Sequence, residues 1–571
     1  MARHLKISSI IVLSLMLYSY GMNSSTTKIP VSTQSEEAED LYHQAFRLNS
    51  IFKADEAKKK LIKAVEIDKD FGAAYIFLSQ FGNNTGSETD NYYEKALSLK
   101  EQLNDVEKCL LEIRTSYRNN NTEKRLEYSK KLLELIPNNA IAHQRMAYTH
   151  WEMGNIEESR KSMLLSIEKD KNYSSAYDNL AGSYMFADPK NYEMAEEYAS
   201  KALSLNKKES YYHVLLGDVY RAQNKLQKAA EKYDDAYEAG TNNFYSAAKA
   251  GHAYTFINPT EARKRFDQAI NDSKNSDQKI GPEYAKVYTY LHENDFQKGL
   301  VQLLDLKNNI DSYGFTDEKK QEEISQILWH EYFIMSHSGQ FDAAKTALDE
   351  KKEIDIVMAK RSKNERAVKN TESSYLWMES HLEIMKGNYD GARRKLVSLK
   401  EIVTGESNPK KFDGYHNLMG MTSLMSGNTE KGVEHFEKVV DQSNIYFQYH
   451  KGLTYKATGD LDKAKEIFQS VATHNFNDLN YTAVRNKALK ELLAEDDGEA
   501  LRQVAMIDTN GNVAVHTGDK CIQAAGHQIG KTYSVQANMM EKETVWPAMA
   551  RAFENTQGDL ADRMMAALEA A

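Results

Sequence analysis

The sequence predicts a mostly α-helical protein, a right-handed superhelix of stacked helical hairpins with a small α+β segment at its C-terminal end. Three observations lead to this prediction. Seven prolines in 571 residues leave room for many uninterrupted helices. Small residues recur at a spacing of 34 through much of the chain. Near residue 494 this period stops, and short β-type runs replace it.

Composition narrows the possible functions. A chain of 571 residues is too long for one compact core, so several domains or a repeat array are expected. The net charge of -10 gives no basic patch, so we expect no nucleic-acid partner. The two cysteines, Cys109 and Cys521, lie too far apart in sequence to suggest a disulfide framework or a cysteine-based zinc site.

The N-terminal stretch is typical of an export signal. Arg3 and Lys6 precede an apolar run at Ile7–Tyr20, and Gly21 offers a cleavage point. We therefore expect residues 1–21 to be a signal peptide and residues 22–37 a polar linker. An uncleaved N-terminal membrane anchor is the alternative, and the only route to a membrane contact. Either reading predicts a protein exported to the periplasm or envelope of a bacterium.

A repeated unit organises residues 38–495. Its clearest copy is residues 211–240, in which Gly217 stands where two helices would cross. We call such a place a crossing position. Steps of 34 residues connect the first five crossing positions, and 34 also separates Gly217 from Gly251. The crossing positions are Ala45, Ser79, Ile113, Ala147, Ala181, Gly217, Gly251, Gly420 and Gly452.

Other positions follow the same period. A residue suited to a left-handed turn recurs seven places after the crossing position, and an apolar ring or leucine recurs sixteen places after it. The turn residues are Gly154, Asn224, Gly427 and Gly459. This spacing indicates a helix, a tight turn and a second, antiparallel helix.

The spacing resembles the tetratricopeptide repeat, a 34-residue helix–turn–helix unit. The resemblance implies about twelve stacked units that share one core, with the first helices lining a concave face that binds a protein or peptide. The period is weakest between Pro282 and Asn370. There, Asn271–Gly281 and Phe315–Gln326 are predicted to be polar insertions.

Four residues are candidates for that concave face. Tyr177 and Tyr212 lie on first helices away from the crossing positions, although packing between helices is an equal alternative. Some members of the repeat family clamp a C-terminal carboxylate with lysine and asparagine. Asn179 and Lys249 are residues of that kind, but the match does not extend to the specificity.

The array offers no pattern of residues for chemistry. His330-Glu331 begins like a zinc-protease helix, but Ile334 stands where the second histidine is needed. No phosphate-binding glycine loop or catalytic triad is recognisable. We therefore expect no enzyme activity, catalytic residue, metal or cofactor in the array.

The last part of the chain, residues 496–571, has a different pattern. Val504–Ile507 and Val513–His516 are predicted strands joined by a hairpin at Asn510-Gly511. Thr532–Gln536 is a predicted third strand. Helices are expected from Glu543 to Asn555 and from Leu560 to Ala570.

This segment resembles the C-terminal half of the domain of unknown function ten-twenty-eight, which has an Ntn-hydrolase-like fold. The resemblance is carried by Arg502-Gln503-Val504, Asp508, His516-Thr517-Gly518, Ala525-Gly526-His527 and Tyr533-Ser-Val-Gln536. Ala537 departs from it, because the family usually has glycine there. In that fold the nucleophile opens the missing N-terminal half, so we expect a partial domain that either caps the array or marks a truncated or misassembled gene.

A polar cluster in this segment is the remaining candidate for chemistry. It consists of His516, Thr517, Cys521 and His527. A strand residue and a small buried thiol are the simpler interpretation of Thr517 and Cys521. Three hypotheses remain: an exported scaffold that binds a protein or peptide, a repeat-linked Ntn-type hydrolase or amidase whose catalytic half is missing, and an envelope assembly component.

Overall fold

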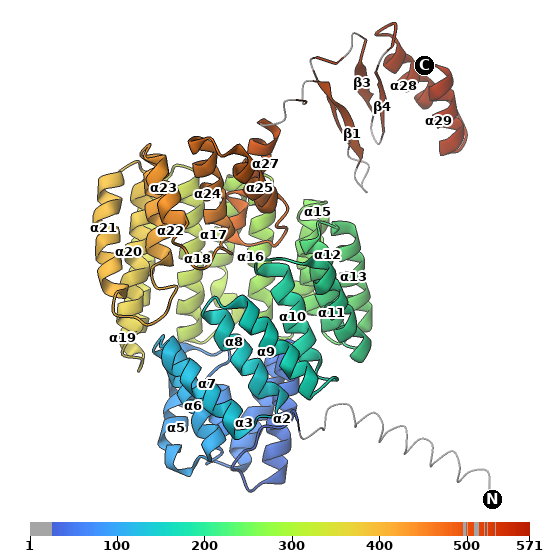
Figure 1. The fold of residues 1–571 in the computed structure, drawn as a ribbon. Helices are drawn as coiled ribbons and strands as arrows, with labels where there is room; N and C mark the ends of the chain where they lie inside the picture. Colours follow the sequence, from blue (N-terminus) through green and yellow to red (C-terminus); the bar gives the residue numbers. More distant parts are fainter. Residues whose placement is uncertain are drawn as a thin grey trace, which may run out of the picture.

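The computed structural model describes residues 26–494, 498, 501–507, 513–518, 520–521, 524–530, 533–538 and 540–571. The predicted signal peptide (1–21) and the predicted hairpin turn at Asn510-Gly511 lie outside the described residues. The described part is mainly helical, with a few short strands near the C-terminal end (Figure 1). This confirms the predicted fold class.

The twenty-four helices α2–α25 form twelve consecutive antiparallel pairs, numbered here as units 1 to 12. Units 1 to 6 are α2 (Glu36–Ser50) with α3 (Ala54–Ile67), α4 (Gly72–Leu78) with α5 (Gly86–Ser98), α6 (Asp105–Arg118) with α7 (Thr122–Leu135), α8 (Ala140–Glu152) with α9 (Ile156–Lys169), α10 (Ser174–Phe186) with α11 (Tyr192–Leu205), and α12 (Ser210–Ala222) with α13 (Leu226–Ala239). Units 7 to 12 are α14 (Asn243–Tyr254) with α15 (Pro259–Asp272), α16 (Ser276–His292) with α17 (Phe296–Asn308), α18 (Asp317–His337) with α19 (Phe341–Arg361), α20 (Ala367–Met385) with α21 (Tyr389–Val403), α22 (Asp413–Met425) with α23 (Thr429–Phe436), and α24 (Ile445–Thr458) with α25 (Leu461–Ala472). Helices α26 (Leu479–Thr482) and α27 (Arg485–Ala494) follow and pack on α24 and α25.

The crossing positions are small because a ring of the second helix lies directly against them. A Cβ added at Gly217 would stand 2.4 Å from the Tyr233 ring, and one at Gly420 would stand 2.8 Å from the Phe436 ring. Each ring is fully buried and lies sixteen residues after its glycine. The predicted spacing is therefore confirmed, and close approach of two helices is its physical cause.

The turns between paired helices are left-handed where the sequence predicts them. Gly154, Asn224, Gly427 and Gly459 have φ values of 78°, 58°, 82° and 88°. Glycine and asparagine adopt this region at little cost, which allows the chain to reverse within two or three residues.

The two predicted polar insertions are helical for most of their length and lengthen the first helices of units 8 and 9. Helix α16 begins at Ser276 and helix α18 at Asp317, so both stretches are largely helical. The side chains of Asn275 and Thr316 cap these helices by accepting from backbone N–H groups. The polar residues occupy the first turns of long helices, where solvent and the caps satisfy them.

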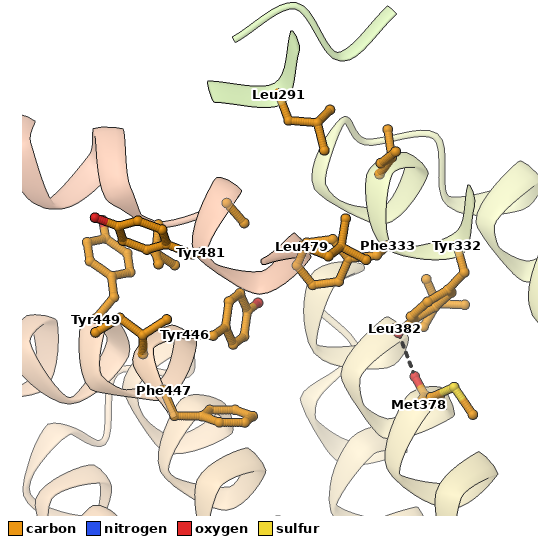
Figure 2. Close-up of a cluster of buried hydrophobic side chains, with 14 of the residues drawn as sticks. Leu291, Tyr332, Phe333, Met378, Leu382, Tyr446, Phe447, Tyr449, Leu479 and Tyr481 are labelled. Atoms are coloured by element: carbon orange, nitrogen blue, oxygen red, sulfur yellow. Dashed lines mark hydrogen bonds between the residues drawn. The ribbon is translucent and has the colours of Figure 1, made fainter. Parts of the chain in front are cut away.

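First helices line the inner face of the superhelix. Successive first helices contact one another, as α12 contacts α14 and α20 contacts α22, more than successive second helices do. The inner face is therefore the more tightly curved one. The largest core cluster runs from unit 8 through α27, and Figure 2 shows part of it around Tyr332, Phe333 and Tyr446.

The chain also folds back on itself over long sequence separations. The carbonyl of Asn475, between α25 and α26, accepts from the guanidinium of Arg221 in unit 6 at 2.8 Å. The side chain of Asn120 in unit 3 donates to Glu406, between α21 and α22, at 2.6 Å. Units 9 to 12 therefore pack against the earlier units, and most of these contacts are polar.

Residues 26–35, within the predicted linker, run as an extended segment along the N-terminal ends of the first helices. The side chain of Asn139 donates to the carbonyl of Lys28 at 2.8 Å, and the N–H of Ser32 donates to Glu107 at 3.0 Å. The segment is thus bound through its own backbone. How the chain divides into domains stays a prediction.

The C-terminal segment stands apart from the helical array (Figure 1). Strand β1 (Gln503–Ile507) pairs antiparallel with β2 (Val513–Thr517), and β3 (Gly526–Ile529) pairs with β4 (Ser534–Ala537). Helix α28 (Val545–Asn555) packs on β3 and β4, and α29 (Leu560–Glu569) packs on α28. Strand β3 was not predicted from the sequence, because its four residues contain a single β-branched side chain.

Candidate functional site

The two tyrosines predicted for the concave face are both buried. Tyr212 is 1% exposed, and its hydroxyl donates to Ser174 at 2.7 Å. The hydroxyl of Tyr177 donates to the carbonyl of Lys171 at 3.1 Å. Packing between units therefore occupies these side chains, and ligand binding by them stays a prediction.

Asn179 and Lys249 are half-buried on the inner face and already have partners. Asn179 donates to the carbonyl of Ser175 at 2.6 Å. Lys249 forms an ion pair with Asp218 at 2.7 Å. The ring of Phe52, from the first hairpin turn, stacks on Tyr211 and Tyr245 beside them, at 5.1 and 5.6 Å between ring centroids. Unit 1 therefore contacts this part of the inner face, and a carboxylate clamp at Asn179 and Lys249 stays a prediction.

The structure brings together two members of the C-terminal cluster. Thr517 Oγ1 and His527 Nδ1 lie 2.8 Å apart, while Gln503 donates to the same hydroxyl at 3.1 Å. His516 precedes Thr517 in the strand, so its side chain points to the opposite face of the sheet. The N–H of Cys521 donates to the carbonyl of Gly518, within a turn. The pair has the separation of a nucleophile and a base, but Gln503 also holds the hydroxyl as part of the sheet.

An open pocket of about 490 Å³ lies on the inner face of units 9 to 11. Residues of α18, α20 and α22 line it, together with two charged residues of α19, Leu399 of α21 and Lys411, which lies just before α22. Its uncharged lining includes Gln326, Trp329, Ser374, Trp377, Met378 and Tyr415, and its charged residues are Lys351, Asp355 and Lys411. A volume of this size is typical of sites that hold a small molecule or a few peptide side chains.

Two tryptophans on adjacent first helices form the aromatic wall of this pocket. The ring centroids of Trp329 and Trp377 lie 6.4 Å apart. Below them, the hydroxyl of Tyr332 donates to the carbonyl of Met378 at 2.9 Å, as Figure 2 shows. His381 stacks on Trp377 with ring planes 3° apart. Both tryptophans therefore rest on a packed layer that fixes their positions.

Burial lowers the pKa of His381 to about 3. The ring behind Trp377 is consequently neutral at pH 7, and it adds no positive charge to the wall. Gly414, on α22, meets the edge of the same indole, because a Cβ there would stand 3.2 Å from Trp377 Cδ1. A side chain at position 414 would crowd the indole.

The charged groups of the pocket are already satisfied. Lys351 pairs with Asp355 at 2.6 Å, and Asp355 also accepts from the Tyr375 hydroxyl at 2.9 Å. Lys411 donates to the carbonyls of Thr404 and Glu406. In contrast, the indole N–H groups and the Tyr415 hydroxyl have no hydrogen-bond partner in the part of the chain that the structure describes, and they are not among its buried polar atoms. The pocket therefore offers aromatic faces and free hydrogen-bonding groups, with little net charge.

The sequence carried a signal for this wall that the 34-residue count did not reveal. Trp329 and Trp377 each stand ten residues before a turn glycine, Gly339 and Gly387. Both therefore occupy the same place in successive first helices. The long first helices of units 9 and 10 hid the period, whereas counting back from the turn glycines would have aligned the two residues.

A larger cavity of about 700 Å³ lies where units 4 to 6 meet units 11 and 12. Lysines and acids line it in mixed order, and several pair with one another, as Lys451 does with Glu437 at 3.0 Å and Lys410 with Asp441 at 3.2 Å. This cavity is the gap between packed units, and its charges compensate each other. The smaller pocket is the better candidate for ligand binding.

Among the described residues, no group of three or more histidine, cysteine or acidic side chains is arranged to hold a metal ion. His330 instead contacts the Tyr288 hydroxyl at 2.8 Å, and Glu331 pairs with Lys307 at 3.1 Å. No helix in the described part of the chain has the length and apolar character needed to cross a membrane.

Comparisons with family models match two parts of the chain. Residues 445–473, within unit 12, match the tetratricopeptide repeat. Residues 469–571 match a family of unknown function, DUF1028. Both resemblances drawn from the sequence are confirmed at these residues. No curated protein matches the chain in sequence.

Several solved tetratricopeptide-type structures match parts of the chain. MamA is 21% identical with a TM-score of 0.24, and the match covers 28% of this chain and 92% of MamA. A thermophilic tetratricopeptide repeat protein of Thermus thermophilus, TTC0263, is 16% identical with a TM-score of 0.27, covering 32% and 98%. A tetratricopeptide repeat protein of Parabacteroides merdae is 12% identical with a TM-score of 0.29, covering 50% and 97%.

Proposed function

We propose that this chain is a scaffold that binds an extended segment of a partner protein in the inner groove of units 9 to 11. One observation carries the proposal: two tryptophans at equivalent places on adjacent first helices, Trp329 and Trp377, form the wall of an open 490 Å³ pocket. Exposed aromatic side chains on a rigid support are the usual anchors of a binding surface.

The arrangement suits recognition of a chain segment. Tryptophan buries a large area while losing little side-chain freedom, and its N–H can donate to a peptide carbonyl. The groove crosses three first helices, α18, α20 and α22, so an extended segment can contact all three. Few rearrangements are needed, because Tyr332 and His381 already hold the wall in place.

A displayed library of random twelve-residue peptides, panned against the full chain, tests the proposal. We expect selected peptides to bind the Trp377→Ala variant at least tenfold more weakly, which is the loss typical of an aromatic anchor. The matched control is Trp151→Ala, a tryptophan of α8 outside this groove. Selected peptides that bind all three proteins equally would contradict the proposal.

We also propose that the protein is exported, on the basis of the charged and apolar pattern of residues 1–21. N-terminal sequencing of the protein from a bacterial periplasmic fraction is expected to start at Met22. A chain that stays in the cytoplasm with Met1 in place would refute export.

A non-enzymatic C-terminal segment is the third part of the proposal. Gln503 and the β-sheet hold the Thr517 hydroxyl, which supports a structural role for its contact with His527. Amidase activity that disappears in a Thr517→Ala variant would support the hydrolase hypothesis instead.

A further inference from the structure

The protein already holds one extended segment of its own, which runs along the N-terminal ends of the first helices and places one side chain on their inner face. Ile29, in the segment 26–35, is 2% exposed and belongs to the same apolar cluster as Ile76 and Leu110. Asn139 donates to the carbonyl before it, that of Lys28, at 2.8 Å. Pro30 follows and is exposed. The inner face of units 2 to 4 thus buries a branched apolar side chain, and the proline that follows it stays at the surface.

The residues under Ile29 correspond in position to the tryptophans of the open pocket. Leu110 stands ten residues before the left-handed turn residue Asn120, as Trp329 and Trp377 stand ten residues before Gly339 and Gly387. Ile76 stands 34 residues before Leu110, one repeat earlier. The two grooves therefore present equivalent positions, filled in units 2 to 4 and open in units 9 to 11.

The chemistry of the open groove narrows what it can hold. Trp329 and Trp377 occupy those positions in the open groove, and their flat rings pack well against the ring of proline. A proline-containing segment is already extended, so binding it costs little conformational entropy. The unpartnered indole N–H groups of the groove suit backbone carbonyls as acceptors. Lys351, Asp355 and Lys411 already have partners, so a charged anchor would find no counter-ion.

We propose, building on the proposed function, that the groove of units 9 to 11 binds an extended, uncharged segment of a partner protein in which proline follows a branched apolar residue. The segment lies across α18, α20 and α22, as residues 26–35 lie across units 2 to 4. The apolar side chain and the proline contact Trp329 and Trp377, and the indole N–H groups donate to its carbonyls.

The test uses the full chain and a capped, fluorescently labelled peptide with the sequence TTQIPVSTQS. This peptide copies residues 26–35 with glutamine in place of Lys28 and carries no charge. We expect binding that weakens at least tenfold when alanine replaces the peptide's proline or aspartate replaces its isoleucine. Trp377→Ala is expected to weaken binding at least tenfold, and Trp151→Ala to leave it unchanged.

A second variant covers the case in which Trp377→Ala does not fold. Trp329→Phe keeps an aromatic ring and removes one N–H donor, so a loss of about threefold to tenfold is expected, with an unchanged thermal melt. Equal binding by the proline and alanine peptides would overturn the proposal. An affinity that stays the same in both tryptophan variants would also overturn it. That result would mean that the peptide binds elsewhere, for example in units 2 to 4 in place of residues 26–35.

The outcomes separate this inference from the function on which it rests. Library peptides that depend on Trp377 but lack the apolar residue and proline would overturn the inference and leave the scaffold function intact. Displacement of library peptides by a neutral oligosaccharide such as maltoheptaose, with no binding of the proline peptide, would overturn the inference in favour of a sugar site. If neither the library peptides nor the proline peptide binds in a way that depends on Trp377, both the inference and the proposed scaffold function would be overturned.

Discussion

At the scale of single residues, the array depends on a few positions where two helices nearly touch. Gly217 faces the ring of Tyr233, which is fully buried and donates to Asp218 at 2.6 Å. The ring cannot retreat without breaking this hydrogen bond. Contact with the Tyr233 ring therefore requires glycine at position 217, although alanine has the higher helix propensity.

We predict that Gly217→Ala lowers the free energy of unfolding by about 1–3 kcal/mol, because the added methyl overpacks the crossing. Gly182→Ala is the matched control, since a Cβ at this position in helix α10 meets nothing within 4 Å. There the change is expected to stabilise by about 0.5–1 kcal/mol. Urea unfolding of both variants measures the difference, and equal effects would contradict the account.

Buried histidines make the stability depend on pH in the acid range. Burial lowers the pKa of His381 to about 3 and that of His450 to about 4. An unfolded histidine binds a proton near pH 6.5, so the unfolded state carries more protons between about pH 6.5 and these values. The stabilising contribution of each histidine is present above pH 6.5 and is lost as the pH falls.

We predict that each of these histidines contributes a loss of about 1.4 kcal/mol per pH unit in that window. His381→Gln can still form hydrogen bonds with the Tyr332 and Tyr446 hydroxyls. We expect it to reduce the slope of unfolding free energy against pH by the contribution of one histidine, about 1.4 kcal/mol per pH unit. Unfolding free energies at pH 7, 6 and 5 provide the comparison. A variant whose acid slope equals that of the unchanged protein would refute the assignment.

At the scale of elements, the identity of the turn residue follows what the turn contacts. In units 3, 6 and 8, Asn120, Asn224 and Asn294 have positive φ values and bond to residues far along the chain. In units 9 to 12 the corresponding residues are glycines, and a Cβ there would meet nothing within 4 Å. Asparagine can form the left-handed turn and also the long-range hydrogen bond, because it tolerates positive φ values and carries a side-chain amide.

We predict that Asn224→Gly lowers stability by about 0.5–1.5 kcal/mol, although glycine is the easier residue for the turn itself. The change removes the hydrogen bond that Asn475 donates to Asn224 at 2.8 Å. Gly427→Asn, in a turn without such a contact, is the control and is expected to change stability little. A harmless Asn224→Gly change would mean that this contact does not hold the units together.

Local elements were predictable because their determinants lie close together in sequence. Gly217, Asn224 and Tyr233 fall within one unit, so spacing alone identified the crossing, the turn and the packed ring. The same local reasoning did not reveal that the polar insertion at the start of α18 is helical, and it missed β3. There the tertiary environment, rather than the local pattern, determines the structure.

At the scale of the whole molecule, spacing could align Trp329 with Trp377 but could not predict which part of the inner face stays open. The four residues predicted for the inner face lie in units 5 to 7, where packing between units buries the two tyrosines and Asn179 and Lys249 have partners within the array. Contacts such as Arg221 with Asn475 join residues 254 apart, and they depend on the summed rotation of many units. Small errors in the rotation assigned to each unit add up along the array, so the sequence does not predict which groove stays open.

The whole molecule contains two equivalent grooves, and comparing them indicates what the open one binds. Two grooves present equivalent positions, and the protein fills one with Ile29 of its own N-terminal segment while leaving the other open. The open groove carries Trp329 and Trp377 where the filled one has Ile76 and Leu110. We propose that an extended segment of another protein occupies the open groove.

Hydrogen exchange on the full chain, with and without a library-selected peptide, tests that claim most directly. We predict slower exchange in α18, α20 and α22 around Trp329, Trp377 and Tyr415, with no change in units 2 to 4 or in the strands β1–β4. Protection confined to units 2 to 4 or to the C-terminal segment, with α18, α20 and α22 unchanged, would contradict the claim.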